Sequence, residues 1–75
     1  MTRSPTLDET TRARVRELLA ERGETAYAVS RRVGKHPSWL ANLLGRTDRS
    51  WRLATLAAVA EALDCEVEVT FFRRR

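Results

Sequence analysis

The chain has very few of the residues that build metal centres, disulfide frameworks or catalytic groups. Its 75 residues include one cysteine and one histidine, too few for a zinc site, a disulfide or a Cys/His dyad with an orienting third group. It has no nucleophile–base pair and no phosphate-binding glycine loop. We therefore expect a protein that is not an enzyme and that holds no metal and no cofactor.

Long hydrophobic runs are also missing. The longest apolar stretch, Leu53 to Leu63, lies between Arg52 and Asp64 and falls well short of the roughly 20 residues that span a membrane. The N-terminus lacks the apolar region of a signal peptide. These absences predict a cytoplasmic protein with no membrane partner.

The composition suits one small globular domain. Hydrophobic residues make up 43% and charged residues 32% of the chain, which argues against disorder. Fourteen Lys and Arg against ten Asp and Glu give a net charge of +4, and this excess of cations favours a polyanionic partner. A domain of this size buries only about 60% of its unfolded surface, so its core is marginal.

Capping residues predict the first two helices. Thr6 with Glu9 three residues later forms a capping box, and Gly23 is a left-handed terminator, so we expect a helix over about 8–22. Thr25 is the expected N-cap of a second helix that ends at Gly34. Val15 and Leu19 have the spacing of an apolar face, while the arginines around them, Arg12 included, are expected in water.

Two further helices follow at helical apolar spacing. His36 and Pro37 are expected as cap and first residue of a helix from Pro37 to Leu44, which follows the second helix after a short glycine-bearing turn. The loop 45–50 leads to a fourth helix over about 53–63. The expected core positions of the two helices are Leu40, Leu43, Leu44, Leu53, Leu56, Val59, Ala60 and Leu63.

The C-terminal end has a different period. Polar and apolar residues alternate over most of 66–72, which predicts a β-strand with Val67, Val69 and Phe71 on one face and Phe72 on the other. A lone strand leaves its backbone groups unpaired, so we expect it to pair antiparallel with a second copy or with another protein. Arg73, Arg74 and Arg75 form a basic tail that either attracts DNA or keeps the chain soluble. Residues 1–75 are thus one domain, with a helical core over 8–64.

Two segments resemble a known family. The run 25–43, TAYAVSRRVGKHPSWLANL, is similar to the core of the Cro/C1 (XRE) helix-turn-helix family, and 55–63, TLAAVAEAL, resembles the helix that follows it. The resemblance covers about residues 8–64. It implies a mainly α, lambda-repressor-like bundle whose third helix lies in the DNA major groove. Relatives commonly end in a further helix, whereas this chain is expected to end in a strand.

The resemblance implies base contacts by residues at the start of the third helix: Pro37, Ser38, Trp39 and Asn42. Asn42 can bind adenine through two hydrogen bonds, or is simply an exposed polar residue. Ser38 contacts a base or phosphate, or helps to cap the helix. Trp39 contacts a thymine methyl or a sugar, or packs against the loop or the first helix. Pro37 stands where relatives often have a polar side chain.

The basic residues between positions 31 and 52 have Asp48 as their one acidic neighbour in sequence. Such a run is either a solvated face or a set of phosphate contacts. Trp51 is expected to anchor the loop before the fourth helix. The predicted phosphate contacts are Thr25, Arg31, Arg32, Lys35, Arg46, Arg49 and Arg52.

These observations predict a dimeric, sequence-specific regulator that binds double-stranded DNA at an inverted repeat and represses by occluding a promoter. The alternative is an antitoxin that binds a partner toxin through its C-terminal strand and regulates its own operon. General RNA binding is less favoured, because the usual aromatic platform and glycine loop are missing.

Overall fold

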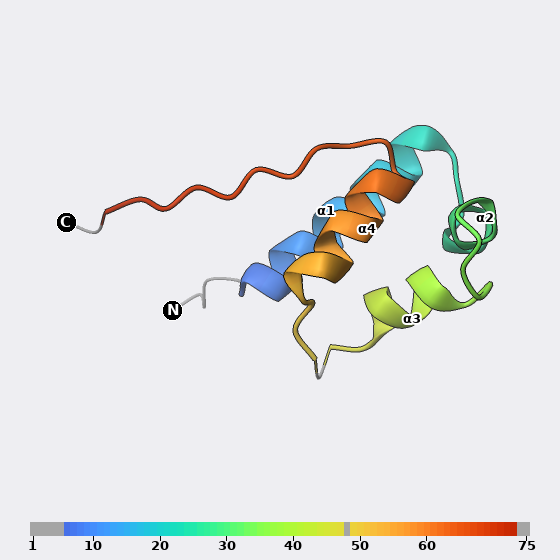
Figure 1. Cartoon of the computed structure of the whole chain (residues 1–75), viewed down its shortest axis with the longest axis horizontal. Helices are drawn as coiled ribbons and strands as arrows, with labels where there is room; N and C mark the ends of the chain where they lie inside the picture. Colours follow the sequence, from blue (N-terminus) through green and yellow to red (C-terminus); the bar gives the residue numbers. More distant parts are fainter. Residues whose placement is uncertain (1–5, 48, 74–75) are drawn as a thin grey trace.

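A computed structural model describes residues 6–47 and 49–73 and contains four helices in this part of the chain. They are α1 (Leu7–Arg22), α2 (Ala26–Arg32), α3 (Trp39–Gly45) and α4 (Leu53–Ala62). Figure 1 shows α2 and α3 on one side of the molecule and the extended C-terminal segment on the other. The described part is thus mainly helical, as a helix-turn-helix bundle requires.

All four helices contribute to one core. Leu40, Val29, Val59 and Leu63 have at most 1% of their surface exposed, and Val15, Leu19, Leu44 and Ala62 surround them. Leu18, Leu43 and the two tryptophans are half-buried against this cluster. The apolar spacing of the sequence therefore identified most of the core.

The predicted caps are confirmed. The Thr6 hydroxyl accepts the N–H of Glu9 at 3.1 Å, and the Thr25 hydroxyl accepts the N–H of Ala28 at 3.1 Å. Gly23 ends α1 with a φ of +65°, a conformation that costs a residue with a Cβ atom far more than glycine. The boundaries of α1 and α2 lie within a residue or so of those predicted.

Helix α3 begins later than predicted. Pro37 and Ser38 form a turn, and the first helical residue is Trp39. His36 still caps this turn, because its Nδ1 accepts the backbone N–H of Ser38 at 3.1 Å and its carbonyl accepts that of Trp39 at 2.9 Å. His36 therefore acts as a cap, as predicted, but it caps the turn before α3, and Pro37 is not the first helical residue.

One buried hydroxyl joins the two helices of the helix-turn-helix unit. Ser30 has 0% of its surface exposed. Its Oγ donates to the carbonyl of Ala26 at 2.8 Å and accepts the N–H of Leu40 at 3.1 Å. Since Leu40 belongs to the first turn of α3, Ser30 satisfies an N–H that has no partner within its own helix. This bond fixes the start of α3 against α2.

Two expectations about burial are wrong. Arg12 has only 4% of its surface exposed, whereas Leu53 is 79% exposed. Leu53 is the first residue of α4, and the buried face of that helix instead runs through Val59, Ala62 and Leu63. The surroundings of Arg12 are described with the functional site below.

The predicted C-terminal β-strand is also wrong for the single chain. Residues 65–73 have no regular secondary structure, and Figure 1 shows this segment running away from the helices. Val67, Val69, Phe71 and Phe72 are between 46% and 93% exposed. A strand exists only where its backbone bonds to a neighbouring strand, and no other described segment supplies one. Arg74 and Arg75 of the predicted basic tail lie outside the described residues.

Candidate nucleic-acid interface

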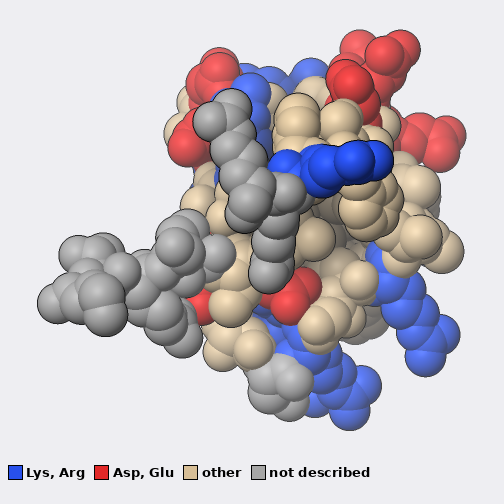
Figure 2. Space-filling model, turned by 90° about the vertical axis from the view of Figure 1, so that its left-hand side faces the viewer, with Lys and Arg blue, Asp and Glu red and all other residues tan. Residues whose placement is uncertain are grey.

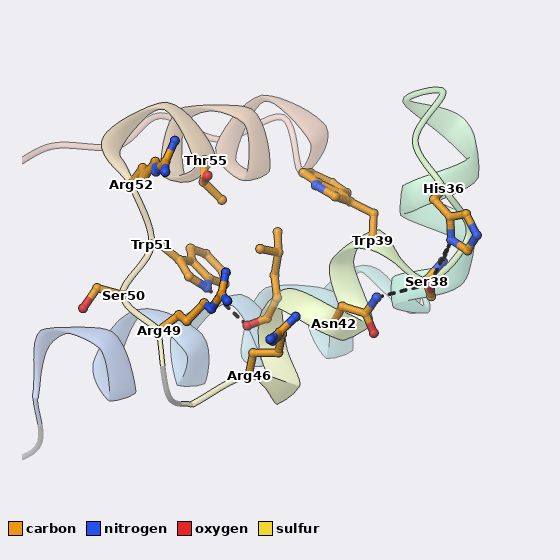
Figure 3. Close-up of a pocket in the computed structure, with 11 residues that line it drawn as sticks. His36, Ser38, Trp39, Asn42, Arg46, Arg49, Ser50, Trp51, Arg52 and Thr55 are labelled. Atoms are coloured by element: carbon orange, nitrogen blue, oxygen red, sulfur yellow. Dashed lines mark hydrogen bonds between the residues drawn. The ribbon is translucent and has the colours of Figure 1, made fainter.

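The exposed side of α3 and the loop that follows it border one hollow of about 670 Å³. Figure 3 shows that its walls come from the start and exposed side of α3, from the loop before α4, and from the first turns of α4. Six of the predicted DNA contacts are among its lining residues: Ser38, Trp39, Asn42, Arg46, Arg49 and Arg52. Side chains that suit base edges and cations that suit phosphates therefore meet on one surface.

The polar groups of α3 form a short hydrogen-bonded chain. The Ser38 hydroxyl lies 2.8 Å from Nδ1 of His36 and accepts from Nδ2 of Asn42 at 3.4 Å. Figure 3 shows the three side chains in a row along this edge of the hollow. Within the described residues, the amide oxygen of Asn42 and its second N–H have no hydrogen-bond partner. An amide in this state can both donate to and accept from adenine.

Trp39 is half-buried and packs against the hydrophobic core. Its side chain extends from α3 toward α4 in Figure 3, and Lys35 Nζ lies 5.7 Å from the centre of its ring, a cation–π distance. The packing predicted as an alternative was against the loop or the first helix, whereas the ring packs against the core cluster and extends toward α4. Its remaining surface lines the hollow.

Three exposed arginines follow α3 along the loop: Arg46, Arg49 and Arg52. Trp51 anchors this loop, as predicted, because it is half-buried against the core and its indole N–H donates to the carbonyl of Leu43 at 3.2 Å. The cations therefore stand on a backbone held close to the end of α3.

The other predicted contacts lie apart from the lining of the hollow. Pro37 is half-buried in the turn before α3, and Thr25 caps α2. Arg31 is exposed, with its guanidinium 5.9 Å from the ring of Tyr27. Arg32 donates to Glu24 and to the carbonyl of Ala62, so its guanidinium is already occupied within the protein.

Glu24 connects Arg32 to Arg22, the last residue of α1. It accepts from Arg22 Nε at 2.5 Å and is also paired with Arg32, while Arg22 donates to the carbonyl of Leu63 at 3.0 Å. These hydrogen bonds, that of Arg22 first, lower the pKa of Glu24 below its ordinary value. The two arginines thus satisfy carbonyls at the end of α4, where cations are favoured.

The sequence did not predict that two arginines of α1 bind the backbone beneath the interface. Arg12 donates to the carbonyls of Leu43, Arg46 and Arg49, and Arg16 donates to that of Leu44 at 3.0 Å. One signal was present: Arg12 stands three residues before Val15 and seven before Leu19, on the same helical face as these core residues.

Basic and acidic side chains both lie on the face that Figure 2 shows. Some basic side chains extend from its lower edge, and others lie near the acidic side chains at its upper edge. The net positive charge of the chain is therefore not confined to one side of this face.

Within residues 6–47 and 49–73, no three His, Cys, Asp or Glu side chains gather in a group that could hold a metal ion. None of the helices in the same part of the chain is long and apolar enough to cross a membrane.

Comparison with known proteins gives one match. No curated protein and no solved structure matches the chain. The family model of the Cro/C1-type helix-turn-helix DNA-binding domain matches residues 14–68, a range that contains most of α1, the α2–α3 unit, the arginine loop and α4. The chain belongs to the Cro/C1-type helix-turn-helix DNA-binding family.

Proposed function

We propose that the protein is a sequence-specific transcriptional repressor that binds DNA as a dimer and reads an inverted repeat with α3 in the major groove. One observation carries this proposal: Ser38 and Asn42 share a hollow with Arg46, Arg49 and Arg52. Specific recognition needs base contacts for sequence and phosphate contacts for position, and this surface offers groups of both kinds.

Asn42 is the principal base contact in this proposal. It is exposed, and its bond to Ser38 engages one N–H of the amide, which leaves a donor and an acceptor for adenine. Ser38 contributes through its hydroxyl, and the exposed part of Trp39 contacts a thymine methyl or a sugar. Pro37 contributes shape alone, because it has no side-chain hydrogen-bonding group.

Phosphate binding falls mainly to the loop arginines in this proposal. Lys35 and Arg31 are exposed at the end of α2 and in the turn after it, and they contribute further phosphate contacts. Thr25 still has a hydroxyl proton that it can donate to a phosphate. Arg32 contributes least, since Glu24 and the carbonyl of Ala62 already hold its guanidinium.

The C-terminal segment is the proposed dimer contact. Val67, Val69 and Phe71 are exposed in the single chain. Acidic residues, Glu66 and Glu68, begin the segment and arginines end it. Antiparallel pairing of two copies would therefore place opposite charges near each other, whereas parallel pairing would place like charges together. Such a dimer would present two α3 helices about 34 Å apart to successive major grooves.

Replacement of Asn42 tests base recognition. Asn42→Ala should weaken binding to the preferred site by about 1–3 kcal/mol and leave binding to random DNA unchanged. Thr10→Ala, which removes an exposed hydroxyl from α1, is the control and should change neither. Equal weakening on both DNAs by Asn42→Ala would refute the assignment.

The exposed phenylalanines support a second candidate function. Phe71 and Phe72 are 93% and 86% exposed, and the two point to opposite sides if the segment is extended. An antitoxin could use such a segment to add a strand to a partner toxin. Sedimentation distinguishes the two cases: a dimer at micromolar concentration favours self-pairing, and a monomer favours a segment reserved for another protein.

A further inference from the structure

Among the described residues, Arg12 is the one arginine that is buried, with 4% of its surface exposed. Within the described residues, every hydrogen bond that it donates goes to a backbone carbonyl. Nε donates to Leu43 at 3.2 Å, and Nη2 donates to Arg46 at 2.6 Å and to Arg49 at 2.5 Å. Its guanidinium also lies 5.8 Å from the centre of the Trp51 ring.

These carbonyls belong to the end of α3 and to the loop after it. The last carbonyls of a helix have no partner within the helix and carry the negative end of its dipole. A buried guanidinium satisfies both needs at once. Its planar array of donors reaches several acceptors in fixed directions, whereas a lysine ammonium is a compact point charge that cannot span the same set.

The two loop residues that Arg12 holds are among those that line the hollow. Arg46 and Arg49 each give their carbonyl to Arg12 and extend their own guanidinium into solvent. A second bond fixes the outer side of the same loop, because the Ser50 hydroxyl donates to Asp8 at 2.8 Å. The backbone under the proposed phosphate contacts is therefore attached to α1.

We propose that Arg12 is a positioning residue of the DNA interface: it does not touch DNA, but it sets where Arg46 and Arg49 stand relative to α3. This inference rests on the proposed function. It extends that function by assigning part of the binding affinity to a buried residue of α1 that lies beneath the interface.

The test is Arg12→Lys, which keeps the net charge, with Arg14→Lys as the matched control on the exposed face of α1. Binding to duplex DNA is measured against salt concentration. Each lost phosphate contact lowers the slope of log K against log salt by about 0.9, so Arg12→Lys should lower it by about 1 to 2 and Arg14→Lys should not change it. General loss of stability in a protein that remains folded would not change the slope at constant charge.

A double-mutant cycle sharpens the result. Arg49→Ala should lower the slope by about 1 in the wild-type background and by clearly less in the Arg12→Lys background, because the contact is already weakened there. Equal effects in both backgrounds, or an unchanged slope in Arg12→Lys, would overturn the proposal.

A measurement on the wild-type protein covers the case in which Arg12→Lys does not fold. If Arg12 holds the loop, the backbone amides of Arg46 and Arg49 should be as rigid as those of the helices before DNA is added, with NMR order parameters near 0.85. Values below about 0.6 would overturn the proposal. A wild-type protein that binds no duplex at all would refute the proposed function as well, whereas normal binding by Arg12→Lys would refute only the role of Arg12.

Discussion

Ser30→Ala should destabilise the protein far more than its small change in size suggests. The substitution removes the hydroxyl that accepts the N–H of Leu40 at 3.1 Å. Leu40 has 0% of its surface exposed, so water cannot replace this acceptor without disturbing the core. A buried donor left without a partner costs about 1–3 kcal/mol.

The expected loss is large for so small a domain. At roughly 0.05–0.15 kcal/mol per residue, a chain of this length has only about 4–11 kcal/mol of stability. One kcal/mol corresponds to about 4–8 °C in the melting temperature of a domain this size. Thermal unfolding followed by circular dichroism should therefore show a clear decrease for Ser30→Ala.

Ser50→Ala is the matched control, because it removes an exposed hydroxyl that donates to Asp8. Such surface substitutions usually change stability by less than about 0.5 kcal/mol. If Ser30→Ala and Ser50→Ala unfold at the same temperature as the wild type, the bond between Ser30 and Leu40 does not hold α3 against α2, and this account of the helix-turn-helix unit is incorrect.

Three further outcomes are expected. The pKa of Glu24 is lowered in the folded state, so its stabilisation is present above about pH 4.3, the ordinary value for a glutamate, and is lost as the pH falls through the folded pKa. Between pH 6 and pH 2 (about the range over which such a carboxylate titrates), the melting temperature should therefore decrease less steeply for Glu24→Gln than for the wild type. Deletion of residues 66–75 should give a monomer by sedimentation that remains folded, since this segment buries little apolar surface in the single chain; a truncated chain that still dimerises would disprove the proposed contact. Arg46→Ala should lower the salt slope of DNA binding by about 1, whereas Arg14→Ala, which removes the same charge from α1, should leave it unchanged; equal slopes for the two variants would count against a phosphate contact by Arg46.

The sequence predicted the features that depend on near neighbours in the chain. Thr6, Thr25 and Gly23 act within their own turns, so local chemistry was enough to place the ends of α1 and α2. The anchoring of Trp51 was also predictable, because a large apolar ring next to a polar loop gains by packing on the core.

The sequence could not predict features that depend on distant partners. Arg12 and Ser30 are polar residue types that usually face water, but here backbone groups from distant parts of the chain satisfy their buried side chains. The segment 66–72 has the alternation of a strand, yet alternation describes side chains and supplies no backbone partner. Six of the predicted DNA contacts line one hollow, while Pro37, Thr25, Arg31, Arg32 and Lys35 lie outside its lining. The role of each residue in DNA binding stays a prediction.

The most direct test of the central claim is selection of bound sites from a random duplex pool at about 150 mM salt, near physiological ionic strength, with the size of the complex measured on the same sample. We expect an inverted repeat bound by two copies of the chain, with half-sites about one helical turn apart. Binding that shows no preferred sequence and disappears as salt is raised would contradict the claim that α3 reads DNA bases.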